Sequence, residues 1–345
     1  MRRTWALLAA GLLFGPPGPN APLRSKAPAR PLLGLSAELA GSSTDAERQR
    51  AAQQIRAGGA SLFAVPISWS ACEPSARSYK VEEILRTVRL LRQSGATVHL
   101  DLPLVSLRAR DVPSDLAAMA FDDPRLSTRL GELLEALEPA LLDASTLSLG
   151  YAAENYFEQR PDELKPYRLL FDGAVVFLKK RTPHLRVGVT TAAPTESAAP
   201  AVAAALHQRS PVLFYLYAPF DRQNPYVHRP PESIERDWKM LLERAAGRPI
   251  AFPEVSYSSS PENGSSPELQ ADFVRRLKRL VASADGNTLL FARYATWRDG
   301  TAGRPPSPPG NALADRRLAF LAHRGLQNEK GEPKPAWREW VRVAP

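Results

Sequence analysis

Short apolar runs alternate with longer amphipathic segments along most of this chain. Residues 61–68, for example, form a mostly apolar run that is typical of a buried strand. Residues 81–94 follow with apolar side chains at helical spacing, and Gly95 ends that segment. The whole pattern predicts strands at residues 32–36, 61–68, 97–102, 146–149, 185–190, 212–217, 249–254 and 288–294, and helices at residues 44–57, 81–94, 127–142, 166–180, 198–208, 231–246, 267–284 and 313–323.

Eight predicted strands thus alternate with eight predicted helices. Apolar strands between amphipathic helices are typical of a parallel sheet whose outer face is covered by helices. Eight such units fit a (β/α)8 TIM barrel, which typically needs about 250 residues and carries loop insertions beyond that. A doubly wound sheet is the alternative, but no G-x-G-x-x-G motif follows any predicted strand. We therefore predict a single barrel domain over residues 31–345.

The first residues have the pattern of a secretory signal peptide. Met1-Arg2-Arg3 is basic, residues 5–14 are apolar, and a stretch of Gly, Pro and small residues follows. Ten apolar residues cannot span a hydrocarbon core of about 30 Å, so we expect no stable membrane insertion. We predict a signal peptide at residues 1–21, a short linker at 22–30, and a secreted or periplasmic protein. The alternative is a frayed apolar N-terminus.

Charge and cysteine content exclude several classes of partner. The chain has 345 residues, with 45 Lys and Arg against 36 Asp and Glu, so its formal net charge is +9. This excess is spread along the chain, and we expect no nucleic-acid partner. Cys72 is the single cysteine, which excludes an intramolecular disulfide and a cysteine-based zinc site, and the five histidines show no metal-ligand spacing. We expect no metal, no cofactor and a monomeric protein.

Polar and aromatic side chains follow most of the predicted strands. In a barrel, the loops after the strands build the active site, so these residues are the candidates. Aromatic rings stack on the apolar faces of sugars, and a pair of carboxyl groups can hydrolyse a glycosidic bond. The sequence therefore favours a carbohydrate substrate or ligand. The candidates are Trp69 and Glu73 after the second strand, Asp101 at the third, Tyr151, Glu154 and Asn155 after the fourth, Tyr217 at the sixth, Glu254 and Tyr257 at the seventh, and Trp297 after the eighth.

Four segments carry a resemblance to a known group of enzymes. Residues 252–261 (FPEVSYSSSP) and 325–337 (GLQNEKGEPKPAW) resemble the nucleophile segment and the closing segment of the retaining glycoside hydrolases of the large (β/α)8 clan. Residues 67–74 (ISWSACEP) and 217–221 (YAPFD) are similar to two further elements of these enzymes. The resemblance implies a barrel fold, with Glu254 as the catalytic nucleophile and Tyr217 as a hydrogen-bond donor to it.

The fourth strand departs from the motif of that clan. The clan has Gly-Asn-Glu there, in which Glu is the acid/base residue, whereas this chain has LGYAAENYF at residues 149–157. Without a gap, Tyr151 replaces the Asn and Ala152 replaces the Glu. Glu154 lies two residues further on, and two residues of extended chain span about 6–7 Å. We expect that only a bulge or local insertion brings Glu154 into the acid/base position.

Two functions from different classes follow. The first is a secreted retaining glycoside hydrolase, with Glu254 as nucleophile and Glu154 as acid/base, whose carboxyl groups should lie about 5–5.5 Å apart. The second is a non-catalytic relative that binds glycan or has a structural role. Single residues have alternatives as well. Trp69 and Trp297 are either sugar-stacking platforms or packing residues, Asp101 is either a substrate contact or a buried core group, and Glu254 alone could form a structural ion pair.

Overall fold

The computed structural model describes residues 30–36, 53, 55–300 and 311–342. The expected signal peptide, nearly all of the expected linker, and most of the expected helix at residues 44–57 lie outside this part of the chain. Within it, no helix is both long enough and apolar enough to cross a membrane.

Nine strands form one sheet, in the order β7-β6-β3-β2-β1-β11-β10-β9-β8. Each strand pair whose register is resolved is parallel. The strands are β1 (Leu32–Leu35), β2 (Leu62–Pro66), β3 (Thr97–Asp101), β6 (Thr146–Ser148), β7 (Arg186–Gly188), β8 (Thr190–Ala192), β9 (Leu213–Tyr217), β10 (Ile250–Val255) and β11 (Leu289–Tyr294).

The two strands at the ends of this order belong to one run of chain. Only Val189 separates β7 from β8 along the chain. Strand β7 pairs with β6 at one end of the sheet order, and β8 is hydrogen-bonded to β9 at the other end. The sheet therefore closes on itself, as in a barrel. This run is the fifth predicted strand, and every other predicted strand has one observed counterpart. The eight strand predictions are confirmed.

Helices separate the strands as predicted, with one correction. The prediction of one helix at residues 127–142 is wrong, because the chain forms α4 (Pro124–Ala136) and α5 (Glu138–Asp143) instead. Pro139 lies in the first turn of α5, and since proline has no backbone N–H it cannot continue the helix before it. The other predicted helices correspond to α3 (Glu82–Gln93), α7 (Leu164–Arg181), α8 (Pro200–Leu206), α9 (Ser233–Ala245), α10 (Pro267–Ser283) and α11 (Ala312–Ala322).

Several short elements lie between these helices and strands. They include α2 (Trp69–Cys72), α6 (Glu154–Gln159), α12 (Pro335–Val341) and the hairpin of β4 (Val105–Ser106) with β5 (Ala109–Arg110). Three single-turn 3-10 helices lie at Ser114–Leu116, Pro161–Glu163 and Pro261–Asn263. The two shortest helices after strands, α2 and α6, contain predicted site residues.

The described chain divides into two compact units. The first contains residues 63–192 and 197–214, and the second contains residues 30–62, 193–196 and 215–342 as far as they are described. Each unit is described by itself below. The expectation of one domain over residues 31–345 stays a prediction.

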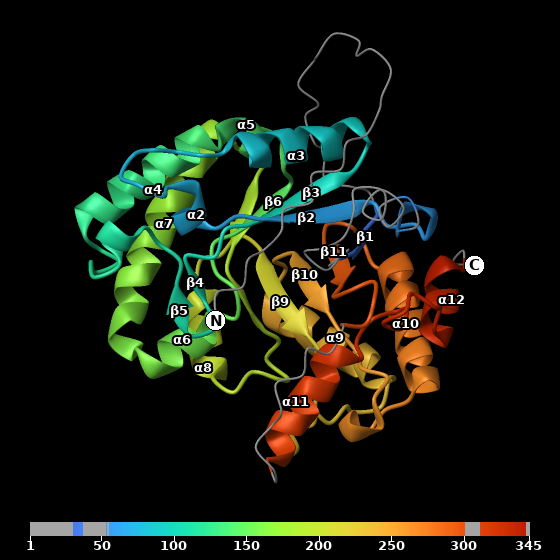
Figure 1. Cartoon of the computed structure of the whole chain (residues 1–345). Coiled ribbons are helices and arrows are strands. Elements are labelled where there is room, and N and C mark those ends of the chain that lie inside the picture. The colour runs from blue at the N-terminus through green and yellow to red at the C-terminus, as the bar shows by residue number, and fades with distance from the viewer. Residues whose placement is uncertain (1–29, 37–52, 54, 301–310, 343–345) are drawn as a thin grey trace. The chain divides into compact units, whose positions relative to one another are not determined.

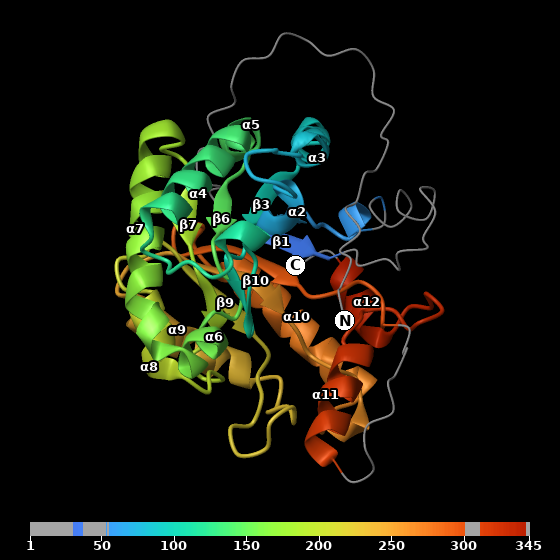
Figure 2. The ribbon, with the colours of Figure 1, turned by 60° about the vertical axis from the view of Figure 1, so that its left-hand side comes forward.

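The first unit has an aromatic core around Phe121. Its ring contacts Tyr156, Phe157 and Tyr167, which come from α6 and α7. Helix α4 begins where Asp123 accepts a hydrogen bond from the backbone N–H of Arg125. Its buried leucines lie on one face, and α4 packs against α7 (Figure 2). These contacts fix the start of α6, which carries Glu154.

The second unit has its own core between β10, β11 and the helices α10 and α12, which lie side by side (Figure 1). The ring of Tyr257 stacks between His228, at 4.0 Å between centroids, and Phe273, at 4.7 Å. The Gln270 amide donates to the backbone carbonyls of Tyr257 and Gly325. These contacts hold the C-terminal ends of β10 and β11, and with them Glu254.

Candidate active site

Glu154 is the first residue of α6, which follows the fourth barrel strand, β6. Its side chain is almost fully buried, with 1% of the residue exposed. The Oε1 atom accepts a hydrogen bond from the backbone N–H of Ala192 at 2.9 Å, and the Asn155 amide lies at 3.4 Å from the same oxygen. Among the described residues, the Oε2 atom has no hydrogen-bond partner. One carboxyl oxygen is therefore fixed and the other is unsatisfied.

Burial raises the pKa of Glu154 from its ordinary value to about 7. The Ala192 N–H acts in the opposite direction, because it stabilises the ionised form, and the nearby Glu158 carboxylate raises the pKa further. A carboxyl group with this pKa is protonated in a large fraction of molecules at neutral pH. That is the property a general acid needs.

The backbone before Glu154 corrects the assumption that this segment is extended. Ala152 is in the left-handed region, with φ of 47°, and Ala153 is already helical. The chain therefore leaves the strand conformation at Ala152, and Glu154 does not lie 6–7 Å further along an extended segment, as the sequence had suggested. A left-handed alanine is sterically unfavourable, so the surrounding structure must hold this turn in place.

Tyr151 and Asn155 flank Glu154. The backbone of Tyr151 pairs with the hairpin strand β4, since its N–H donates to Val105 and its carbonyl accepts from Leu107. The Asn155 side chain donates to the carbonyl of Ala152 at 3.2 Å, which closes the turn. Both side chains are partly exposed beside Glu154, and their contact with a sugar stays a prediction.

Glu254 lies near the C-terminal end of β10, the seventh barrel strand, in the second unit. Arg324, which follows α11, donates from Nη1 to Oε1 of Glu254 at 2.5 Å. Ser256 donates to the same oxygen at 3.3 Å. The side chains of Glu254 and Arg324 are 17% and 13% exposed, so this ion pair is mostly shielded from water but retains a solvent-accessible edge. The Glu254 carboxylate is thus fixed by Arg324 and Ser256 and remains partly accessible to solvent.

Tyr217, at the end of β9, has a different partner from the one expected. Its hydroxyl donates to Oδ2 of Asp237 on α9, at 2.9 Å. A hydroxyl donates a single hydrogen bond, so the expected donation from Tyr217 to Glu254 is wrong. Asp237 also accepts hydrogen bonds from both terminal nitrogens of Arg229. Burial, together with the nearby carboxylates, raises the pKa of Tyr217 well above its ordinary value. Tyr217 therefore belongs to a buried ionic network.

Glu196 extends this network. Its Oε2 accepts from the backbone N–H of Ala218 at 2.8 Å, and Arg229 lies 3.9 Å from its Oε1. Burial raises the pKa of Glu196 well above its ordinary value. Sequence reasoning missed Glu196, although it lies in the segment after the fifth barrel strand.

Trp69 and Glu73 form an internal contact of the first unit. Trp69 is fully buried at the start of α2, and its indole N–H donates to Oε2 of Glu73 at 2.8 Å. Arg129 forms an ion pair with the other oxygen of Glu73, and the backbone N–H of Arg77 donates to it as well. No face of Trp69 is open to stack on a sugar. We therefore assign Trp69 and Glu73 to the packing of this unit and leave both out of the proposed site.

Tyr257 is also a core residue. Both faces of its ring are covered, as described above, and its hydroxyl donates to the carbonyl of Arg229 at 3.0 Å. Neither the ring nor the hydroxyl is left for a substrate. The expected substrate contact of Tyr257 is therefore replaced by a role in holding the segment after β10.

Asp101 and Trp297 remain candidates. Asp101 ends β3 and is half-buried, while its backbone carbonyl accepts from Ile67. Trp297 follows β11, is 4% exposed, and its indole N–H has no acceptor among the described residues. Trp337 lies 6.4 Å from it between ring centroids, and the guanidinium of Arg298 lies over its ring.

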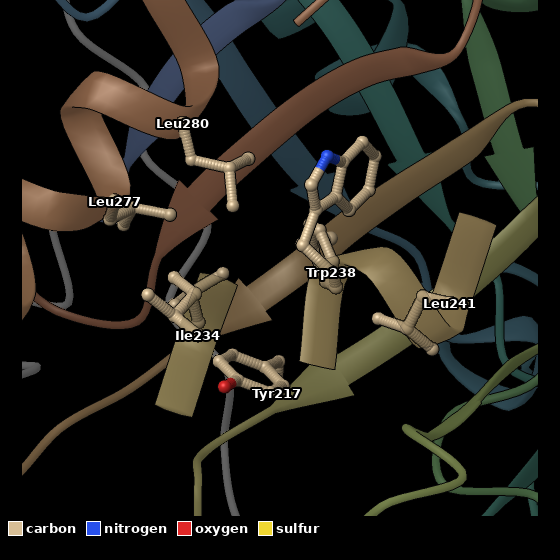
Figure 3. A pocket seen from close by; sticks show the side chains of 8 residues that line it. Tyr217, Ile234, Trp238, Leu241, Leu277 and Leu280 are labelled. Carbon is tan, nitrogen blue, oxygen red and sulfur yellow. The ribbon is translucent and has the colours of Figure 1, made fainter. Parts of the chain in front are cut away.

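The described residues hold no group of three or more His, Cys, Asp or Glu side chains that could bind a metal ion. A small pocket in the second unit is lined only by apolar and aromatic residues (Figure 3). Its lining comes from β9, α9, β10 and α10, so it lies in the layer between strands and helices: Tyr217, Ile234, Trp238, Leu241, Phe252, Val255, Leu277 and Leu280. It contains no carboxylate and is not a site for sugar chemistry.

No protein-family model matches the chain, and no curated protein matches it. Solved structures do match. A family 5 glycoside hydrolase (GH5_18) from Streptomyces cattleya, solved with GlcNAc, has a TM-score of 0.65 at 15% identity, over 90% of this chain and 79% of that one. Xylanase 10B from Thermotoga maritima has a TM-score of 0.59 at 13% identity, over 90% of this chain and 94% of that one.

An exo-β-1,4-mannosidase from Opitutaceae bacterium strain TAV5 has a TM-score of 0.63 at 12% identity, over 90% of this chain and 58% of that one. This chain has the (β/α)8 fold of these glycoside hydrolases. The predicted fold class is confirmed, and so is the resemblance to this group of barrels. At such low identity the likeness is one of fold, and the chemistry must be argued from the residues described above.

Proposed function

We propose that this protein is a retaining glycoside hydrolase, with Glu154 as acid/base and Glu254 as nucleophile. The observation that carries the proposal is the state of Glu154, which is buried directly after the fourth strand with a pKa of about 7 and one unsatisfied carboxyl oxygen. A carboxyl group in this state can give up a proton and later take one back at neutral pH.

In the first step, Glu154 donates its proton to the glycosidic oxygen while the Glu254 carboxylate attacks the anomeric carbon. The bond to the leaving group breaks, the alcohol departs with the proton, and a glycosyl ester forms on Glu254. In the second step, ionised Glu154 takes a proton from water. The resulting nucleophile attacks the anomeric carbon, and the ester bond to Glu254 breaks.

The environment of Glu254 suits a nucleophile that must be ionised. The guanidinium of Arg324 favours the charged form of Glu254. The partial exposure of the Glu254 side chain leaves it accessible to a substrate. The remaining proposed contacts with the sugar are Tyr151, Asn155, Asp101 and Trp297. The separation of the two catalytic carboxyl groups, about 5–5.5 Å in a retaining enzyme, stays a prediction. We further propose export through the signal peptide, action on a polysaccharide or oligosaccharide, and a monomeric state.

A second function is favoured by one observation. Glu254 already has a strong partner in Arg324, and Ala152 stands at the position where the clan has its acid/base Glu. A barrel with these features could bind glycan without cleaving it. The same ion pair would then have a structural role.

Hydrolysis of aryl glycosides and of intact polysaccharides separates the two functions. We expect the wild type to cleave both, Glu254→Gln to cleave neither, and Glu154→Gln to retain activity only on aryl glycosides. The reason is that an activated phenolate leaves without protonation, whereas a sugar alkoxide does not. Binding of polysaccharide by wild type with no cleavage of any substrate would replace the hydrolase by the glycan-binding protein.

A further inference from the structure

One buried ion pair of the second unit holds the backbone on both sides of Arg324. Asp299 follows β11 and Lys334 directly precedes α12, and their side chains are only 8% and 10% exposed. The Oδ1 atom of Asp299 accepts a hydrogen bond from the backbone N–H of Gly325 at 2.7 Å. The ammonium group of Lys334 donates to the backbone carbonyl of His323 at 3.2 Å. The residues before and after Arg324 are therefore held by the two members of a single pair.

The pair itself is tightly joined and largely shielded from water. The Lys334 ammonium lies 3.0 Å from each carboxylate oxygen of Asp299. Burial raises the pKa of Asp299 and lowers the pKa of Lys334 from their ordinary values, while the charge of each partner opposes the shift of the other. The His323 ring, which is 52% exposed at its side chain, lies 4.0 Å from the same carboxylate. Removal of one member therefore leaves the other as a poorly solvated charge.

Further contacts fix the same short stretch of backbone. The carbonyl of His323 also accepts hydrogen bonds from the backbone N–H and the hydroxyl of Ser259, at 3.0 and 3.2 Å. The carbonyl of Gly325 accepts one from the Gln270 amide at 3.1 Å. A Cβ at Gly325 would collide with the backbone nitrogen of Asp299, so the two segments approach as closely as their backbones allow. This stretch therefore has little freedom to shift.

Arg324 is the residue that these contacts place. Its Nη1 donates to Oε1 of Glu254, and the side chains of both are mostly shielded from water. The backbone position of an arginine sets where its guanidinium can reach, so the fixed neighbours of Arg324 limit the geometry of this contact. Ser259 follows Glu254 on the same segment, and its bonds to His323 join that segment to the one that carries Arg324. The guanidinium therefore meets the carboxylate in one fixed arrangement.

We propose that Asp299 and Lys334 are positioning residues for the Arg324 guanidinium and, through it, for the Glu254 carboxylate. The catalytic consequence of this inference rests on the proposed function, in which Glu254 attacks the anomeric carbon. A displacement of reacting groups by about 1 Å can lower a rate by about a hundredfold. Loosening of Arg324 should therefore lower kcat and leave KM nearly unchanged, because the groups that bind the sugar are not altered.

Lys334→Met tests the pair, and Lys278→Met is its matched control. Lys278, on α10, likewise donates to backbone carbonyls, which lie within and just after α12. Both variants thus lose a lysine that holds backbone in the second unit, at two different stretches. With nitrophenyl glycosides, we expect Lys334→Met to lower kcat by about tenfold or more and to change KM by less than about twofold. Lys278→Met should leave kcat and KM within about twofold of the wild type.

A second measurement requires no turnover. Urea unfolding gives the loss of unfolding free energy caused by Arg324→Gln in the wild type, in Lys334→Met and in Lys278→Met. We expect this loss to fall to about half or less in Lys334→Met, because the contact with Glu254 is already weakened there, and to be unchanged in Lys278→Met. If Lys334→Met does not fold, Asp299→Asn takes its place in both measurements, since it keeps an acceptor for the Gly325 N–H and removes only the charge.

The outcomes separate this inference from the proposed function. Equal losses from Arg324→Gln in all three backgrounds overturn the positioning role, whatever the activity. An active wild type whose kcat is unchanged by Lys334→Met, or is lowered as much by Lys278→Met, also overturns the positioning role and leaves the hydrolase standing. A reduced loss in Lys334→Met alone, with no turnover of any aryl glycoside or polysaccharide by the wild type, supports the positioning of Arg324 and overturns the hydrolase.

Discussion

The carboxylate of Glu254 accepts a hydrogen bond from Nη1 of Arg324 at 2.5 Å, across 70 residues of sequence. Glu254 lies in the segment that resembles the nucleophile segment of the clan, and Arg324 directly precedes the segment, residues 325–337, that resembles its closing segment. The contact ties the last part of the chain to the seventh strand. It also gives the candidate nucleophile a fixed position and a nearby positive charge.

Glu254→Gln should abolish hydrolysis and change stability little. The amide keeps the shape and an oxygen acceptor for Arg324 but cannot attack as a carboxylate. We expect kcat/KM to fall by at least about a thousandfold, as expected when a nucleophile is removed. The free energy of unfolding should fall by less than about 2 kcal/mol, because the amide keeps a hydrogen-bond acceptor for Arg324.

Activity assays and urea unfolding on the same preparation check both expectations. A large loss of stability in Glu254→Gln, with no catalytic effect in the fraction that folds, would identify Glu254 as a structural residue. Arg279→Gln on α10 serves as the control for a change of one charge on the exposed face of the second unit.

The pH dependence of hydrolysis should report on Glu154. Burial raises its pKa to about 7, so the protonated form that acts as general acid is lost as pH rises above that value. For substrates with a poor leaving group, kcat/KM should decline on the alkaline side with an apparent pKa near 7. In Glu154→Gln the remaining activity on aryl glycosides should lack this alkaline decline. An unchanged pH profile in the variant would remove Glu154 from the mechanism.

The stability of the protein should also depend on Glu154. The folded pKa lies above the ordinary value of 4.5, so between these two pH values the folded state keeps a proton that the unfolded chain has released. Stability therefore decreases as pH rises from about 4.5 to about 7 and is then constant. The decrease due to this group is on the order of 3 kcal/mol. Urea unfolding at a series of pH values should show it in wild type and not in Glu154→Gln.

The network around Asp237 should be essential for the second unit. Asp237 is buried and accepts from Tyr217 and from both terminal nitrogens of Arg229. Asp237→Asn removes the nearer of the two carboxyl groups beside the Arg229 guanidinium, and we expect a loss of about 3 kcal/mol in the free energy of unfolding.

Arg236→Gln is the matched control for this prediction. Arg236 also lies near Asp237, at 3.9 Å, but its side chain is 74% exposed. Its removal should cost less than about 0.5 kcal/mol, because exposed ion pairs contribute little. Equal losses in the two variants, measured by urea unfolding, would show that burial does not decide the contribution of this network.

The alternation of apolar runs and amphipathic segments was sufficient to predict the barrel. Each of the eight strands is a local feature, because burial on both faces requires a continuous apolar run wherever a strand lies. Local patterns were less reliable at breaks. Pro139 divided one predicted helix, and Val189 divided one predicted strand, since each break depends on a single residue within an otherwise regular pattern.

The candidate site was predictable only in part. Glu154 and Glu254 could be found because each follows or ends a strand. The roles of the aromatic residues that follow the strands could not be predicted. An aromatic residue after a strand has the same sequence pattern whether it contacts a sugar or packs in the core. The ring of Tyr257 stacks against His228 and Phe273, and Trp69 is fully buried within the first unit. No local sequence pattern indicates these contacts.

The sequence by itself determined the order of strands and helices, the barrel fold, and the position of carboxylates at strand ends, since all of these follow from periodicity and spacing along the chain. The tertiary structure decided which charges meet. Arg324 donates a hydrogen bond to Glu254, and Asp237 accepts one from the hydroxyl of Tyr217. The left-handed backbone of Ala152 directs the chain so that the side chain of Glu154 is buried. Pairing and desolvation depend on residues far apart in sequence, and they set the protonation state on which the proposed chemistry depends.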